Sequence, residues 1–253
     1  MSPVHREWDA RTYDRVADPM TRWGVSVLDR LVLAGDETVL DVGCGTGRVT
    51  ELLLERLPAG RVVANDASDD MLAMAARRLE PFGERVRMIG GDVLDLRPEA
   101  LAGWAPVDAV LSTATFHWVL DHDRLFAVLA ALMRPGAALV AQCGAAGNIE
   151  GLMAAVRATG TERAGAWYYA TSEETLRRLE AAGFVDAEVW THPEPTRIEP
   201  RAELEAYLET VCLRTHVAAM AEPERAGFVA AVADAMPEPV IDYVRLDIVA
   251  RRA

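Results

Sequence analysis

The stretch Thr38-Val39-Leu40-Asp41-Val42-Gly43-Cys44-Gly45-Thr46-Gly47 decides the fold, because an apolar run and an acid lead directly into a glycine-rich turn. The segment over residues 48–57 then carries apolar side chains at helical spacing. Strand, tight turn and helix in this order predict the opening of a doubly wound nucleotide-binding sheet. Glycines 43, 45 and 47 allow positive φ and let a ligand approach the backbone closely.

The spacing of these glycines separates two classes of cofactor. A dinucleotide-binding turn reads G-x-G-x-x-G and directs a helix N-terminus at a pyrophosphate, whereas here Gly43, Gly45 and Gly47 alternate. Asp41 would repel a phosphate and attract an ammonium group. The pattern resembles motif I of the class I S-adenosylmethionine-dependent methyltransferases. The resemblance implies S-adenosyl-L-methionine as cofactor, with its methionyl part at the turn; an ordinary glycine turn is the alternative.

Acids also end the next two expected strands. Asp66 closes an apolar stretch and lies 19 residues beyond the last glycine of the turn, a spacing that suits hydrogen bonds from two ribose hydroxyls. Asp66 could instead cap the following helix, but Ser68 is the better cap. Asp92 follows the third strand, and the resemblance implies that it binds the adenine amino group while the backbone N–H of Val93 faces the ring.

Three further residues complete the expected cofactor site. Ala67 directly follows Asp66. Met71 lies one turn into the next helix and could cover the adenine or belong to the core. Thr113 ends the fourth strand, at the edge of the sheet where α/β proteins bind ligands.

The rest of the chain continues to alternate strands and helices. The class is α/β, and the resemblance implies a doubly wound, mostly parallel, seven-stranded Rossmann-like methyltransferase sheet. We expect an N-terminal helical cap, a cofactor-binding core, a helical cover and a final core strand, over residues 1–35, 36–192, 193–238 and 239–253. Later strands are expected at 107–112, 137–143, 184–191 and 241–251, and helices at 124–133, 149–159, 172–182, 202–220 and 222–236.

Composition limits the partners. The chain has 253 residues, 51% of them hydrophobic, and a net charge of −13. This charge argues against nucleic acid and against an anionic membrane. The three cysteines have no metal spacing, so no metal site is expected. Residues 1–14 lack the apolar stretch of a signal peptide, and no run suits a membrane helix. We expect a cytoplasmic protein with a small-molecule substrate; the oligomeric state cannot be read from the sequence.

Three further segments extend the resemblance to particular groups of methyltransferases. Trp8-Asp9-x-x-x-Tyr13, Phe116-His117-Trp118 and the stretch over residues 243–252 resemble trans-aconitate methyltransferases and juvenile hormone acid methyltransferases. Both groups methylate a carboxylate oxygen, so the resemblance implies this reaction by in-line displacement. A carboxylate is ionised at pH 7 and needs no general base, unlike a phenol, alcohol or amine. Methylation of another metabolite, or use of the cofactor without methyl transfer, remain alternatives.

His117 and Tyr13 are the candidate catalytic residues. His117 follows the fourth strand and could contact the substrate as a donor or a base, or be an ordinary loop histidine. The resemblance implies that the segment carrying Tyr13 folds over the cofactor, so Tyr13 could touch the cofactor carboxylate or the substrate. His122 follows the expected helix cap Asp121 and is expected on a solvated first turn.

Aromatic residues provide the candidate substrate contacts. Trp118 would form a wall, Trp8 and Trp23 lie in the N-terminal segment, and Tyr168 could face Trp118. Packing in the core is the alternative for each.

Cations are scarce near the expected pocket, and the chain has no lysine. Arg197, Arg201 and Arg214 fall in the expected cover, where an arginine could bind a substrate carboxylate. A tricarboxylate requires several converging cations, so we expect a more apolar acid.

Overall fold

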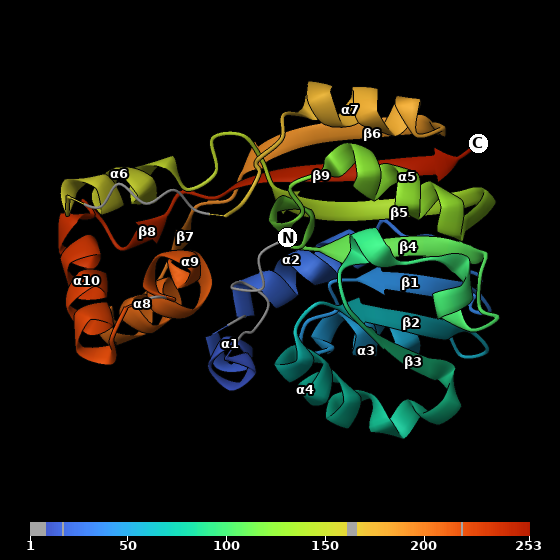
Figure 1. Cartoon of the computed structure of the whole chain (residues 1–253), viewed down its shortest axis with the longest axis horizontal. Coiled ribbons are helices and arrows are strands. Elements are labelled where there is room, and N and C mark those ends of the chain that lie inside the picture. Colours follow the sequence, from blue (N-terminus) through green and yellow to red (C-terminus); the bar gives the residue numbers. More distant parts are fainter. Residues whose placement is uncertain (1–8, 17, 161–165, 219) are drawn as a thin grey trace.

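A mixed β-sheet forms the centre of the protein. The computed structural model describes residues 9–16, 18–160, 166–218 and 220–253. In these residues seven strands form one sheet in the order β3-β2-β1-β4-β5-β9-β6 (Figure 1). Their bounds are β1 (Thr38–Val42), β2 (Arg61–Asp66), β3 (Val86–Gly90), β4 (Val107–Thr113), β5 (Met133–Gly144), β6 (Phe184–Pro193) and β9 (Val244–Arg252). β1 to β5 pair in parallel, and β9 lies antiparallel between β5 and β6, which confirms the expected mostly parallel sheet.

Helices cover both faces of this sheet. α2 (Asp18–Leu28), α3 (Arg48–Glu55) and α4 (Asp69–Leu79) contribute to the apolar cluster on one face. α5 (His122–Leu132) and α7 (Ser172–Ala181) contribute to the cluster on the other. Successive side chains of a strand point to opposite faces, so Val39 and Leu40 of β1 fall in different clusters. Burial on both faces explains why β1 carries apolar side chains on both, at Val39 and Val42 as well as Leu40.

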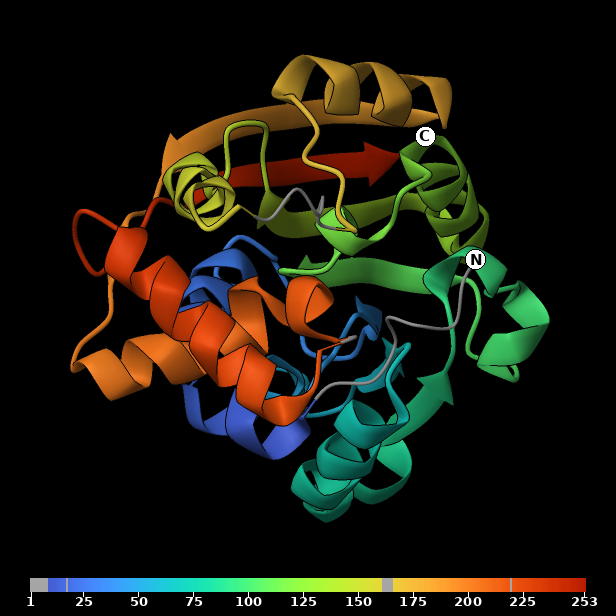
Figure 2. The same ribbon diagram turned by 60° about the vertical axis from the view of Figure 1, so that its left-hand side comes forward.

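A helical cover adjoins one end of the sheet (Figures 1 and 2). It consists of α6 (Glu150–Ala158), α8 (Arg201–Tyr207), the π-helical turn η6 (Leu208–Cys212), α9 (Arg214–Val217), α10 (Glu222–Ala235) and the strand pair β7 (Thr196–Arg197) and β8 (Val240–Ile241). These elements share an apolar cluster that also includes Trp23 of α2 and Tyr243. The cover is therefore packed against the rest of the protein through two aromatic side chains.

The remaining elements are short. α1 (Ala10–Val16) precedes α2. In the part of the chain that the structure describes, 3₁₀ turns lie in the loops at η2 (Glu80–Arg85), η3 (Val93–Asp95), η4 (Pro98–Leu101) and η5 (Phe116–Trp118).

Some expected boundaries were wrong. The helix expected over 202–220 is interrupted by η6, where the backbone N–H of Leu213 donates to the carbonyl of Leu208 at 2.7 Å. β5 begins at Met133, ahead of the expected start at residue 137, because Met133 pairs with Val107 ahead of a register shift. β9 begins at Val244 because the preceding strand, β8, pairs with β7.

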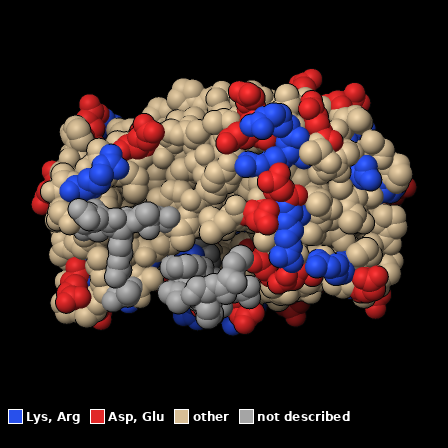
Figure 3. All heavy atoms as spheres, turned by 45° about the horizontal axis from the view of Figure 1, so that its top comes forward, with Lys and Arg blue, Asp and Glu red and all other residues tan. Residues whose placement is uncertain are grey.

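Charged side chains of both signs are intermixed on the face in Figure 3. Within the described ranges, no helix is both long enough and apolar enough to cross a bilayer.

Candidate ligand-binding site

A cavity of about 310 Å³ lies at the carboxyl ends of the parallel strands. Val42, Asp66, Gly91 and Thr113, at or just beyond the ends of β1, β2, β3 and β4, all line it. Parallel α/β sheets bind ligands at this edge, where loops leave the strands.

The glycine turn forms one wall of this cavity. Gly43 and Gly45 have φ values of +75° and +54°, which disfavour side chains. A Cβ at Gly43 would lie 2.0 Å from Oγ1 of Thr115, so this glycine permits a close approach between two loops. A Cβ at Gly45 would meet nothing within 4 Å. The backbone of Gly45 is therefore the part of the turn that is open to the cavity.

Asp41 and Gly47 do not line the cavity. Asp41 is 1% exposed, and its Oδ2 accepts a hydrogen bond from Oγ1 of Thr50 at 2.6 Å. Burial raises the pKa of this carboxyl to about 7. Gly47 lies at the start of α3, where a Cβ would be 3.2 Å from Ala75. Asp41 and Gly47 therefore support the turn from behind, and their expected contact with the cofactor stays a prediction.

Two carboxylates face the cavity from neighbouring strands. Asp66 accepts the N–H of Gly45 on Oδ2 and the N–H of Ser68 on Oδ1, both at 2.9 Å. Ser68 caps α4, as expected. Asp92 accepts the N–H of Leu94 at 3.0 Å and so caps η3. Ionised carboxylates are acceptors only, so this edge of the cavity suits a ligand rich in hydroxyl and amino donors.

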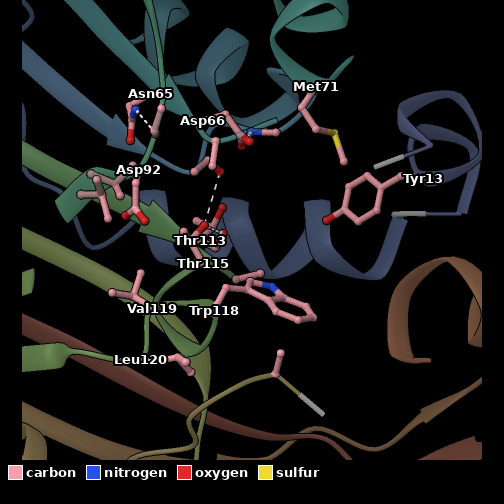
Figure 4. A pocket seen from close by; sticks show the side chains of 18 of the residues that line it. Tyr13, Asn65, Asp66, Met71, Asp92, Thr113, Thr115, Trp118, Val119 and Leu120 are labelled. Atoms are coloured by element: carbon pink, nitrogen blue, oxygen red, sulfur yellow. Dashed lines mark hydrogen bonds between the residues drawn. The ribbon is translucent and has the colours of Figure 1, made fainter. Parts of the chain in front are cut away.

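The other expected cofactor residues lie around the same space. Ala67 and Val93 line it. Met71 and Thr113, which are labelled in Figure 4, line it as well.

Tyr13 closes the cavity on the side opposite the acids. Figure 4 shows the hydroxyl of Tyr13 directed into the cavity. The helix that carries Tyr13 is held by Asp14, whose Oδ1 accepts hydrogen bonds from Thr46 at 2.7 Å, Arg48 at 2.9 Å and Arg78 at 3.1 Å. Burial, reinforced by nearby Asp66, raises the pKa of Tyr13 to about 12. Tyr13 is therefore a hydrogen-bond donor at neutral pH and not a base.

A second, smaller cavity of about 50 Å³ adjoins the first. Tyr13, Ala114 and Trp118 line both, so they form the boundary between the two spaces. Four other aromatic side chains line the smaller cavity: Trp23, Trp167, Tyr169 and Tyr243.

His117 also lines the smaller cavity and is only 8% exposed. The backbone N–H of Gly144 donates to its Nδ1 at 3.3 Å, so the proton of the neutral ring resides on Nε2. Burial, together with the positive charge of Arg245, lowers the pKa of His117 to about 3. His117 is therefore a neutral donor at Nε2 and is poorly suited to accept a proton.

Sequence reasoning missed Arg245, the charged residue that lines this cavity. Arg245 lies in β9 and is 2% exposed. Its Nε donates to Oε1 of Gln142 at 3.2 Å, and its guanidinium lies 4.6 Å from the ring centroid of Trp23. Within the described residues, Nη2 has no hydrogen-bond partner. A charged residue in an apolar, alternating strand was the available signal.

Not all expected substrate contacts converge here. Trp118 and Trp23 line the smaller cavity, and Trp8 lies outside the described residues. Tyr168 lines neither cavity: its hydroxyl lies 3.2 Å from Glu174 and 3.0 Å from Arg178. The expected substrate contact of Tyr168 is corrected, because this polar pair holds its side chain away from the site.

The solvated position expected for His122 was wrong. His122 is 3% exposed, and its Nε2 lies 2.9 Å from the carbonyl oxygen of Phe116. Asp121 does cap the helix, accepting the N–H of Arg124 at 2.9 Å. His122 therefore braces the loop that carries His117.

The three arginines expected in the cover differ in position. Arg197 and Arg201 are paired with acids at the surface. Arg214 lines the larger cavity, and its guanidinium lies 5.6 Å from the ring centroid of Trp118.

Comparison with known sequences gives consistent relatives. Residues 39–136 match a family model described as a methyltransferase domain. A trans-aconitate 2-methyltransferase from Azoarcus sp. (strain BH72) is 32% identical over 237 residues, covering 88% of this chain and 87% of that protein. Another, from Methylobacterium nodulans, is 38% identical over 136 residues, covering 54% of this chain and 49% of that protein.

The fold also matches solved structures. A Haemonchus contortus phosphoethanolamine N-methyltransferase 2, in complex with phosphomonomethylethanolamine and S-adenosylhomocysteine, superposes with a TM-score of 0.65 at 18% identity. The match covers 96% of this chain and 57% of that one, so the chain spans little more than half of the larger protein. At this identity the likeness concerns the fold.

Proposed function

The chain belongs to the class I S-adenosylmethionine-dependent methyltransferases, and from this premise we propose that it methylates a carboxylate oxygen of a small acid. The protein is a methyltransferase, and S-adenosylmethionine is its cofactor. The acceptor is the part that we propose.

The residues around the larger cavity fit this cofactor. Its volume of about 310 Å³ falls within the range of small-molecule sites. Gly45 leaves room for a ligand against the backbone. Asp66 would accept hydrogen bonds from the ribose hydroxyls, and Asp92 one from the adenine amino group. Val93 and Met71 would contact the adenine ring.

The hydroxyl of Tyr13 is placed to donate to the cofactor carboxylate or to the acceptor. Ala67 and Thr113 would complete the walls of the cofactor cavity. When bound, the cofactor supplies a methyl group on a positively charged sulfur. A carboxylate oxygen could accept that methyl group, with the electron pair of the S–C bond remaining on sulfur.

The observation that carries the proposal is the setting of His117, which is buried and whose Nδ1 accepts the N–H of Gly144. With Nδ1 occupied by the N–H of Gly144 and a pKa of about 3, its ring offers a proton and does not take one. Tyr13, with a pKa of about 12, also stays protonated. A phenol, alcohol or ammonium acceptor must lose a proton, whereas a carboxylate has already lost it. The name of the Azoarcus relative supports the same acceptor, because trans-aconitate is a carboxylic acid.

The experiment uses S-adenosylmethionine with a labelled methyl group and a panel of acids, phenols and amines. Methyl esters release labelled methanol in mild alkali, whereas aryl ethers, N-methyl and C-methyl products do not. We expect alkali-labile label with one or more acids. Label that enters only alkali-stable products would refute carboxylate methylation and leave the methyltransferase assignment intact.

A further inference from the structure

We propose that Arg245 is the anchor that binds the substrate carboxylate, and that the cavity around it selects an acid with a single carboxylate and an apolar body. This inference rests on the proposed function, since it assigns a binding group to the acid that is methylated. Nothing in the sequence motifs of the cofactor site requires an arginine at this position.

The first argument is the missing counter-charge. Arg245 is 2% exposed, and a guanidinium stays protonated in proteins. Charged side chains are seldom this buried unless they are paired. Yet within the described residues Nη2 makes no hydrogen bond, while Nε donates to the amide of Gln142 and the guanidinium lies over the ring of Trp23. A carboxylate in the smaller cavity would supply both the charge and the acceptors.

The second argument is that the nearest acid along the same strand, Asp247, is already paired with other groups. Asp247 lies two residues further along β9, on the same face of the strand, and is fully buried. It is ion-paired with Arg30, accepts a hydrogen bond from Nε2 of Gln142 at 2.9 Å, and lies 3.0 Å from Nδ1 of His192. With Asp247 neutralised by these groups, the charge of Arg245 remains available to a ligand.

The third argument is preorganisation. Gln142 fixes one edge of the guanidinium through Nε, and Trp23 covers one of its faces. An arginine held in this way loses little further freedom when it binds. Nε2–H of His117, which lines the same cavity, offers a second donor for the other side of the acid.

Selectivity follows from the rest of the lining. Of the described residues around the smaller cavity, Arg245 alone carries a formal charge, because His117 is neutral. Trp167, Tyr169 and Tyr243 supply aromatic surface. One cation matches one carboxylate, and further carboxylates would lose water without gaining a partner. At about 10–15 Å³ for each water-sized occupant, the volume of about 50 Å³ suits a carboxylate with a few carbon atoms.

The test follows binding of three probes by tryptophan fluorescence, with the protein saturated with S-adenosylhomocysteine. Butyrate carries one carboxylate, butyramide is its neutral counterpart, and trans-aconitate carries three carboxylates. The wild-type protein should bind butyrate at least about tenfold more tightly than butyramide, because the charged guanidinium of Arg245 binds a carboxylate more strongly than a neutral amide. It should also prefer butyrate to trans-aconitate. This comparison needs no variant and so does not depend on how well a variant folds.

Variants then test which arginine supplies the charge that binds butyrate. Arg245→Gln should weaken butyrate binding at least about tenfold, Arg245→Lys less, and both should keep the wild-type affinity for S-adenosylhomocysteine. Arg177→Gln, at an exposed position of α7, is the matched control and should change nothing. Arg214→Gln tests whether the cation that lines the larger cavity binds the carboxylate instead.

Three results would overturn the inference. They are equal binding of butyrate and butyramide, unchanged butyrate binding in Arg245→Gln, and a loss that follows Arg214 instead. Tighter binding of trans-aconitate than of butyrate would refute the single-carboxylate selectivity. Each of these leaves methyl transfer to acids untouched, whereas failure to bind S-adenosylhomocysteine, or label only in alkali-stable products, would count against the proposed function itself.

Discussion

Alanine at Gly43 and alanine at Gly45 should have different consequences, although both glycines have positive φ. The left-handed backbone costs a residue with a Cβ about 1–2 kcal/mol at either position. At Gly43 the new Cβ would also lie 2.0 Å from Oγ1 of Thr115 and 2.4 Å from its Cγ2. At Gly45 it would meet nothing within 4 Å.

The difference between the two variants in the free energy of unfolding can be estimated from the interactions that Thr115 would lose. Its hydroxyl donates at 3.0 Å to the carbonyl of Thr113 and lies 3.4 Å from that of Gly43. Moving this side chain loses a hydrogen bond, about 0.5–1.5 kcal/mol, and adds strain from overpacking of about 1–3 kcal/mol. We expect Gly43→Ala to lower the free energy of unfolding by about 3–6 kcal/mol and Gly45→Ala by about 1–2 kcal/mol.

For ligand binding, we expect Gly45→Ala to be the more informative substitution. The methyl group of Gly45→Ala would project toward the larger cavity, where we place the cofactor. It should therefore weaken binding of S-adenosylhomocysteine by more than its small effect on stability suggests.

Urea denaturation without ligand measures the first quantity, and calorimetric titration of the folded variants measures the second. Equal destabilisation by the two substitutions would refute the argument from the Thr115 contact. Wild-type affinity in Gly45→Ala would refute the placement of the ligand against the turn.

Three further outcomes are expected. Asp14→Asn should weaken ligand binding and lower stability by about 1–3 kcal/mol, because this partly buried acid holds Arg48 and Arg78 and thereby positions Tyr13; an unchanged titration with S-adenosylhomocysteine would contradict this. Burial raises the pKa of Asp41 from 3.8 to about 7, so between these values the folded protein holds a proton that the unfolded chain has lost, and the contribution of this group to stability falls as pH rises. In the wild type this lowers the free energy of unfolding by about 1.4 kcal/mol per pH unit, and Asp41→Asn removes the dependence. In urea titrations, the free energy of unfolding of the variant relative to that of the wild type should therefore rise by about 2–3 kcal/mol between pH 5 and pH 7. Finally, kcat/KM for an acid should be flat from about pH 6 to pH 9, because the pKa values of His117 and Tyr13 are about 3 and about 12; a rising limb near pH 6.5 would indicate a catalytic base.

The sequence alone determined the sheet and its ligand-binding edge. Hydrophobic runs, breaker residues and acids at strand ends are local patterns, and parallel strands bring their carboxyl ends to one edge. Asp66, Asp92 and Gly45 could therefore be assigned to one cavity before any contact was known. The π-helical turn η6 could not be predicted, because periodicity over 202–220 does not show which residues pack against Tyr243.

Which residues line the smaller cavity, where we place the acceptor, was decided only by the tertiary structure. Arg245 and His117 lie 128 positions apart in the chain, and they meet because β9 inserts beside β5, whose last residue donates to His117. Tyr168 and Tyr169 are adjacent and equally aromatic, yet only Tyr169 lines the smaller cavity, since a partner on α7 holds Tyr168 away. The protonation states of His117 and Asp41 likewise depend on burial. Burial is a property of the packed chain, and no local pattern encodes it.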